Sequence, residues 1–150
     1  MAPRNQETLD QLQDPEKRPP VQIQSLPPSV TGYVAANAIQ LDGNRLIQNL
    51  RGARKGGAPG PSGMHNEHLK PLLESPAATA ALHGVANRFA SADLPVSVSR
   101  ALCLCRMVAL QKGAPGVSQA HGASSRVSGL AVGDTFRRLV GRTLAQQFHE

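Results

Sequence analysis

Apolar residues recur at helical spacing in three stretches of this chain, and each stretch predicts a helix. The first helix ends before the glycine-rich residues 56–63. The apolar side chains on one of its faces are Leu41, Leu46, Ile47 and Leu50. The second opens with Ser75 as N-cap and Pro76 in the first turn, and it ends near Asp93. Its apolar stripe comprises Leu82, Val85 and Phe89.

The third helix follows Asp134, which is a natural N-cap residue. Its apolar residues fall at i, i+3, i+4 and i+8; they are Phe136, Leu139, Val140 and Leu144. Two weaker signals lie between these helices. A helical turn at residues 65–69 meets Pro71, where the helix either kinks or restarts, and a short helix begins at Leu94-Pro95.

Two short apolar runs interrupt the helical pattern. Residues 103–110 fit a buried strand or a helix end equally well, because periodicity cannot separate the two over so few residues. Residues 127–132 fit a strand, and the Gly-, Pro- and Ser-rich residues 113–126 between the runs fit an exposed loop. The predicted fold class is therefore mainly α with a small β-hairpin (α+β).

The first 31 residues differ from the rest. Six of the 12 prolines fall between Pro3 and Pro28, among Gln, Glu, Asp and Lys, so residues 1–31 are predicted to be a disordered tail. Residues 32–150 then form one folded domain. That domain holds few large aromatic side chains, because the whole chain has three Phe, one Tyr and no Trp, and we expect it to be marginally stable alone.

Basic residues concentrate in the predicted domain. Residues 1–50 carry four basic and five acidic groups, whereas residues 51–150 carry 12 basic and five acidic groups. This distribution favours a polyanionic partner such as RNA or DNA, although scattered arginines can equally keep a surface solvated. Arg137, Arg138 and Arg142 lie on the last helix away from its apolar stripe, where they form either a phosphate-contacting face or an ordinary solvated one.

Other kinds of site find little support. The glycine loop lacks the Gly-Lys-Ser/Thr of a P-loop and the spacing of a dinucleotide fold, and no Gly-x-Ser-x-Gly elbow is present. His65 with His68, and Cys103 with Cys105, lack the partners of a metal site, so neither a metal nor a catalytic residue is predicted. No signal peptide or membrane span is visible, which predicts an intracellular protein with reduced cysteines.

Three blocks resemble a known enzyme family when taken in order. Residues 53–74 contain an Ala-Pro-Gly-Pro-Ser-Gly loop before Glu-His-Leu, residues 106–112 are an apolar run ending in Lys112, and residues 129–147 contain Gly-x-x-x-Gly-Asp-x-x-Arg-Arg-Leu. Together they resemble the N-terminal, fingers-side part of a reverse transcriptase (RNA-directed DNA polymerase) of the non-LTR retrotransposon type. The resemblance implies that residues 32–150 are an incomplete polymerase domain, a fingers subdomain without its palm.

The resemblance also implies roles for particular residues. Lys112 would contact the nucleotide triphosphate. Arg126 would replace the family's strand arginine, because Ser128 stands at that arginine's own position. Arg137, Arg138 and Arg142 would contact an RNA or DNA template. Apart from the resemblance, the Gly/Pro composition predicts a rigid turn at residues 56–63, with Gly57, Pro59, Gly60 and Gly63 as its structural residues.

Polymerisation is not expected from these 150 residues. The family holds Mg²⁺ on palm aspartates that include an Asp-Asp pair, and no Asp-Asp dipeptide occurs here. No cofactor is therefore predicted, and the expected partners are a nucleic-acid template and the missing palm domain. Two alternatives stay open: a small basic helical module, unrelated to polymerases, that binds nucleic acid or protein, and an inert relic of a retroelement.

Overall fold

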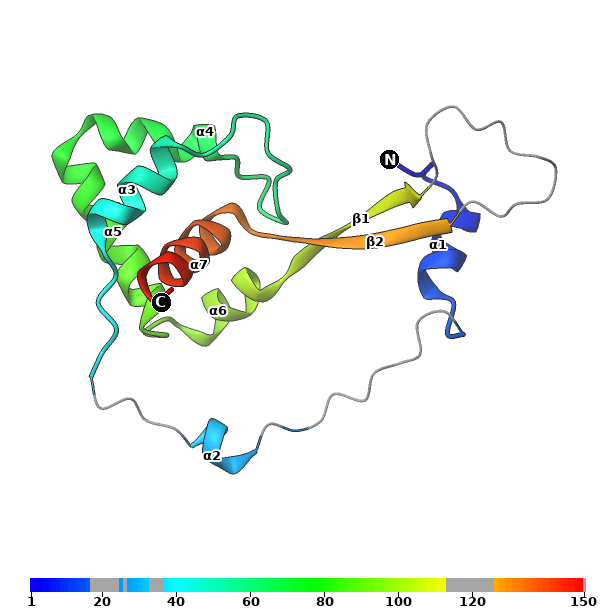
Figure 1. The fold of residues 1–150 in the computed structure, drawn as a ribbon, viewed down its shortest axis with the longest axis horizontal. Coiled ribbons are helices and arrows are strands. Elements are labelled where there is room, and N and C mark those ends of the chain that lie inside the picture. Colours follow the sequence, from blue (N-terminus) through cyan, green and yellow to red (C-terminus); the bar gives the residue numbers. More distant parts are fainter. Residues whose placement is uncertain (17–24, 26, 33–36, 113–125, 150) are drawn as a thin grey trace. The chain divides into compact units, whose positions relative to one another are not determined.

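A computed structural model describes residues 1–16, 25, 27–32, 37–112 and 126–149. The elements follow one another as α1 (Gln6–Gln13), α2 (Pro28–Thr31), α3 (Gly43–Arg51), α4 (Asn66–Leu69), the 3₁₀ helix η1 (Lys70–Glu74), α5 (Pro76–Ala90), α6 (Val96–Cys103), β1 (Cys105–Lys112), β2 (Arg126–Gly133) and α7 (Thr135–Gln147) (Figure 1). Helices dominate, and β1 and β2 form a two-stranded antiparallel sheet. The predicted class, mainly α with a small β-hairpin, is confirmed.

The chain divides into two compact units. The larger comprises Ala35–Arg106 and Val132–Glu150, and the smaller comprises Met1–Val34 and Met107–Ala131. Every helix in the described part of the chain is too short or too polar to cross a lipid bilayer.

The core of the larger unit lies where α3, η1, α5 and α7 meet (Figure 1). It is built mostly from leucines: Leu41, Leu46, Leu50, Leu69, Leu82, Ala86, Leu139 and Val140. Phe89 and Phe136 add one edge-to-face aromatic pair, with ring centroids 5.9 Å apart. The predicted apolar faces of α3 and α7 are thus the buried ones.

A polar contact crosses this core between α3 and α7. The side-chain amide of Asn49 donates to Oγ1 of Thr143 at 3.1 Å, and that hydroxyl donates to the carbonyl of Leu139 at 2.9 Å. Thr143 is fully buried and Asn49 nearly so. Both buried side chains therefore have hydrogen-bond partners, which fixes the two helices in one register.

The second predicted helix begins as expected and packs differently. The hydroxyl of Ser75 accepts from the backbone N–H of Ala78, which makes Ser75 the N-cap of α5. The predicted stripe is wrong at Val85, which is 54% exposed. Leu82 and Ala86, four residues apart, are the buried pair instead, because Val85 lies about 100° around the helix from Ala86.

A new helix begins at Lys70-Pro71, and the preceding helix is not kinked by the proline. The α-helix α4 ends at Leu69, and Pro71 occupies the first turn of η1, where its missing N–H costs no hydrogen bond.

The ambiguous residues 103–110 contribute mainly to β1, and β2 extends the predicted strand at residues 127–132 by one residue at each end. Of the two alternatives for residues 103–110, the strand is the one that forms, but it is not buried, because Leu104 and Met107 are each 61% exposed. A two-stranded ribbon buries a side chain only where another element covers it. The predicted loop residues 113–125 lie outside the described residues.

Residues 6–13 are helical, within the segment that composition predicted to be disordered. Asn5 caps α1, because its side-chain oxygen accepts from the backbone N–H of Thr8 at 2.9 Å. The side-chain amide of Gln6 also donates to the carboxylate of Asp10, one turn later. In the smaller unit the backbone N–H of Ala2 also donates to the carbonyl of Ala109. Local capping thus gives these residues a helix that proline content alone does not predict, whereas residues 17–24 and 26 lie outside the described residues.

Candidate functional site

The glycine loop, residues 56–63, is seated on the first turn of α7. Gly60 is buried there, and a Cβ built on it would lie 2.5 Å from Cα of Asp134 and 2.7 Å from the carbonyl oxygen of Gly133. No side chain fits such a gap, so this position requires glycine for a close backbone approach.

Three polar contacts hold the loop and the flanking Met64 in place. The hydroxyl of Ser62 donates to the carboxylate of Asp134, and Thr135 Oγ1 donates to the carbonyl of Met64. The third contact runs from Nη2 of Arg138 to the carbonyl of Ala58, at 2.7 Å. These contacts join two blocks that are far apart in the sequence.

Asp134 has a second role, as predicted. Its other carboxylate oxygen accepts from the backbone N–H of Phe136 at 3.0 Å, which makes it the N-cap of α7. One carboxylate therefore starts the helix and anchors the loop.

The four predicted loop residues contribute unequally. Besides the close approach at Gly60, Gly63 has a positive φ of 72°, a backbone conformation that favours glycine. Gly57 has neither requirement, because a Cβ there would lie 3.7 Å from its nearest neighbour, the amide nitrogen of Asn66. Pro59 is half-buried within the loop.

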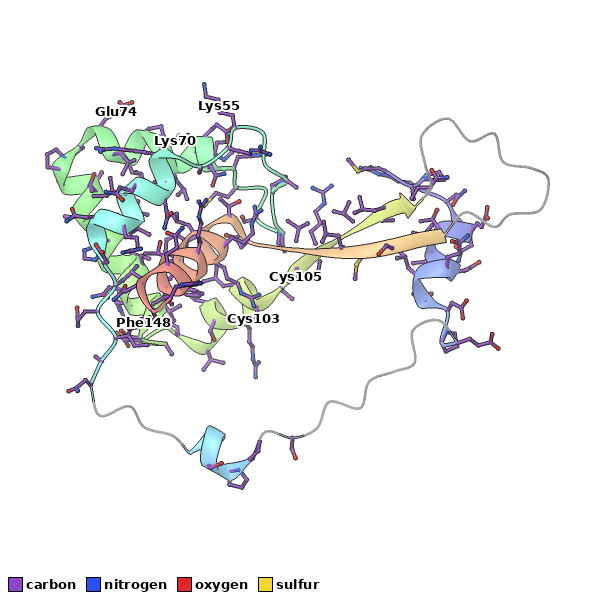
Figure 2. All side chains as sticks on the ribbon, viewed as in Figure 1. Lys55, Lys70, Glu74, Cys103, Cys105 and Phe148 are labelled. Atoms are coloured by element: carbon purple, nitrogen blue, oxygen red, sulfur yellow. The ribbon has the colours of Figure 1, made fainter. Side chains whose placement is uncertain are left out.

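The three predicted arginines of α7 do not form one face. Arg137 donates from Nη1 to the carbonyl of Cys103, 3.3 Å away, close to the start of β1 where Figure 2 labels Cys103 and Cys105. Arg138 and Arg142 are one turn apart and line a different place, a pocket of about 230 Å³. The geometry thus separates Arg137 from the other two.

That pocket, which we call the arginine pocket, lies beside the seated loop. It is lined by Asn49, Ala53, Arg54, Asn66, Thr135, Arg138, Leu139 and Arg142. Asn49, Thr135 and Leu139 are buried and form its floor, and the three arginines are exposed at its rim. No carboxylate is among the lining residues, so the pocket concentrates positive charge.

Arg54 is the residue that sequence reasoning missed. It follows α3 and precedes the glycine loop, and its backbone carbonyl accepts from the side-chain amide of Asn66 at 3.0 Å. In the part of the chain that the structure describes, the guanidinium groups of Arg54 and Arg142 have no hydrogen-bond or ion-pair partner. Both are therefore free to bind an anion.

The predicted nucleotide contacts, Lys112 and Arg126, are the last residue of β1 and the first residue of β2. Since the strands are antiparallel neighbours, both residues stand at the loop end of the hairpin. Their side chains lie outside the described residues.

Two carboxylates in the larger unit have lowered pKa values. The pKa of Glu67 is below its ordinary value of 4.5, chiefly because the backbone N–H of Gly56 donates to the carboxylate. The pKa of Asp42 is below its ordinary value of 3.8, chiefly because the N–H of Arg45 donates to it at the start of α3. Both carboxylates are therefore structural acceptors, one at the loop and one at a helix cap.

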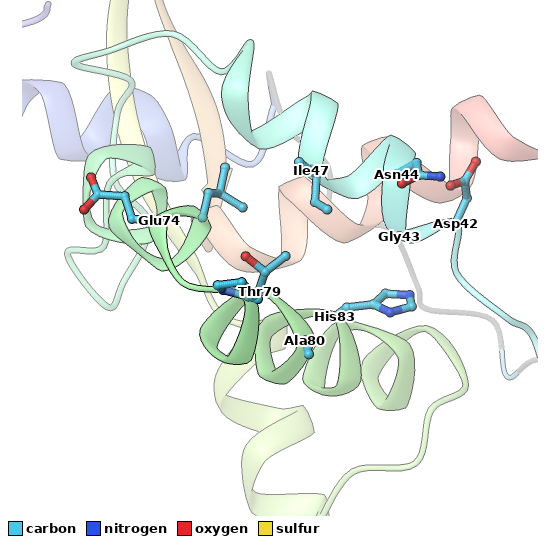
Figure 3. Close-up of a pocket in the computed structure, with 10 residues that line it drawn as sticks. Asp42, Gly43, Asn44, Ile47, Glu74, Thr79, Ala80 and His83 are labelled. Carbon is cyan, nitrogen blue, oxygen red and sulfur yellow. The ribbon is translucent and has the colours of Figure 1, made fainter.

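A larger cavity of about 600 Å³ lies between α3 and α5 (Figure 3). Its polar groups include Asp42, Glu74 and His83, and Figure 3 shows Glu74 at the opposite end from the other two. The imidazole is already engaged, because its Nε2 donates to the carbonyl of Leu41 at 2.8 Å. Among the described residues, no three His, Cys, Asp or Glu side chains are placed to hold a metal ion. The polar groups described in this cavity therefore do not point toward one common ligand position.

Comparisons of the chain with protein-family models, with curated proteins and with solved structures found no match.

Proposed function

We propose that this chain is a nucleic-acid-binding fragment similar to the fingers side of a non-LTR retrotransposon reverse transcriptase, acting inside the cell. Its task is to hold an RNA or DNA strand by its phosphates. Without the palm aspartates these 150 residues contribute binding and not polymerisation, and Mg²⁺ is required only by a complete polymerase.

The observation that carries the proposal is the junction of the glycine loop with α7. Two of the three blocks that carry the resemblance, residues 53–74 and 129–147, meet at Gly60 and Asp134. A loop that cannot accept a Cβ at Gly60, next to a helix whose arginines flank it, is more specific than either segment taken alone. The charge excess of residues 51–150 supports a polyanionic partner at the same place.

Salt dependence tests the proposal. Binding of the full chain to a fluorescent uridine oligonucleotide of about 20 nucleotides, longer than the ~4–16 nucleotides that small single-strand sites cover, would be followed by anisotropy. If the chain holds the strand by its phosphates, the logarithm of the affinity should fall linearly against the logarithm of salt, with a slope of about −0.7 for each phosphate that the chain neutralises. Absence of binding at low salt would refute the proposal.

A second candidate, protein binding, rests on an apolar groove of about 520 Å³ in the larger unit. Met64, Leu69, Val85 and Leu102 are among its lining residues. A partner docked there would bind with little dependence on salt, because apolar burial releases no counterions. The same titration therefore separates the two candidates.

A further inference from the structure

We propose that the arginine pocket is a site for one phosphate group, held between Arg54 and Arg142. The inference rests on the proposed function when the phosphate is a phosphodiester of RNA or DNA, and the same chemistry would accept free inorganic phosphate. It assigns a binding role to Arg54, and it gives Arg138 a positioning role.

The contacts of the three arginines assign them different roles. The guanidinium of Arg138 is already engaged within the protein, because its Nη2 donates to the carbonyl of Ala58 and to Oγ1 of Thr135. Arg54 and Arg142 come from different elements, line the same pocket and have free guanidinium groups within the described residues. Guanidinium groups match a phosphate through paired N–H donors, so two free ones facing one cavity form a phosphate clamp.

The floor of the pocket fits a small anion. Its buried polar side chains already have partners, because the amide of Asn49 donates to Thr143 and the hydroxyl of Thr135 donates to Met64. These hydrogen bonds hold the two floor side chains in fixed positions. The volume, about 230 Å³, equals roughly eight waters at ~30 Å³ each, enough for a phosphate group and a few waters.

The first arm of the test uses the oligonucleotide described above with Arg54→Gln, Arg142→Gln and the matched control Arg100→Gln. Arg100 is an exposed arginine on α6 that does not line the pocket. Because the two arginines share one phosphate, each pocket variant should weaken binding about fivefold and reduce the salt slope by at most ~0.7, while the control stays within about twofold. Arg142→Lys should restore the slope and only part of the affinity, because an ammonium cannot donate as a fork.

The second arm titrates the full chain with inorganic phosphate and follows the arginine Nε–Hε signals by NMR, with chloride at matched ionic strength as the blank. Signals that disappear in Arg54→Gln and Arg142→Gln identify the two residues. We expect phosphate to shift both of these signals and to leave that of Arg100 in place.

The two arms distinguish failure of the pocket from failure of the proposed function. Equal weakening by Arg54→Gln, Arg142→Gln and Arg100→Gln, with no phosphate-induced shifts, would overturn the pocket and leave nucleic-acid binding standing as a diffuse charge effect. If the oligonucleotide does not bind but phosphate shifts both signals, the proposed function fails and the pocket stands as a site for free phosphate. Failure of both arms overturns both.

Discussion

Replacing Gly60 with alanine should destabilise the larger unit far more than a surface loop substitution normally does. The new Cβ would lie 2.5 Å from Cα and 2.7 Å from N of Asp134, and 2.7 Å from the carbonyl oxygen of Gly133. All three are backbone atoms at the start of α7, so no side-chain rotation can relieve the clash. The loop must lift away from the helix.

The loss of unfolding free energy can be estimated from the contacts that would break when the loop lifts away from α7. Overpacking against fixed atoms costs about 1–3 kcal/mol. The hydrogen bonds from Ser62 to Asp134 and from Arg138 to Ala58 would lengthen as well, and each is worth about 1 kcal/mol. We expect a loss of about 3–5 kcal/mol, which for a domain of this size lowers the melting temperature by more than about 10 °C.

Urea denaturation of the full chain, followed by far-UV circular dichroism, measures this loss. The matched control is Gly57→Ala in the same loop, where a Cβ would lie 3.7 Å from its nearest neighbour, and its effect should stay within about 0.5 kcal/mol. Indistinguishable midpoints for the two variants would refute the seating of the loop on α7.

Three further substitutions test other parts of the larger unit. Gly84→Ala in α5, where a Cβ would meet no atom within 4 Å, should stabilise by about 0.5–1 kcal/mol in urea denaturation, because alanine is the better helix former. Thr143→Val should cost about 1–3 kcal/mol by leaving the buried amide of Asn49 unpaired, and a double change with Asn49→Leu should recover part of that loss. The N–H of Gly56 lowers the pKa of Glu67 in the folded chain. The ionised carboxylate of Glu67 therefore stabilises the fold fully above pH 4.5, its ordinary pKa, and this stabilisation disappears as the pH falls through the lower pKa of the folded state. Unfolding midpoints of Glu67→Gln should therefore fall less on acidification than those of the parent chain.

The helices of the larger unit were predictable because their signals are local. Ser75 and Asp134 each place an oxygen where a first-turn N–H needs an acceptor, and a helix begins after each of them, as α5 and α7. Burial was less predictable. Val85 and Met107 are apolar in a pattern that fits a core, yet both are more than half exposed, because what covers a residue is decided by packing.

The strand at residues 105–112 shows the same limit. Its apolar run fits a helix end as well as a strand, and pairing with residues 126–133 decides the outcome. That pairing joins segments on either side of a long loop, so no window of sequence contains it.

The candidate site was predictable only along one helix. Arg138 and Arg142 are four residues apart and must share a face of α7, whereas Arg137 is rotated about 100° from its neighbour and points elsewhere. Helix geometry alone could have removed Arg137 from the set. Arg54 could not have been added in that way, because it lies after α3 and reaches the pocket only through the packing of α3 against α7.

The loop therefore links stability to binding, and this link can be tested. The carbonyl of Ala58 can hold Arg138 only while Gly60 is seated, and Arg138 lines the same pocket as Arg54 and Arg142. Gly60→Ala should then lower both the urea midpoint and the affinity for the oligonucleotide, although it removes no charge. Arg142→Gln should lower the affinity alone, because its guanidinium has no partner within the described residues. If Gly60→Ala destabilised the unit but left the affinity and its salt slope unchanged, phosphates would have to be held away from the loop, and the charge of α7 alone would account for binding.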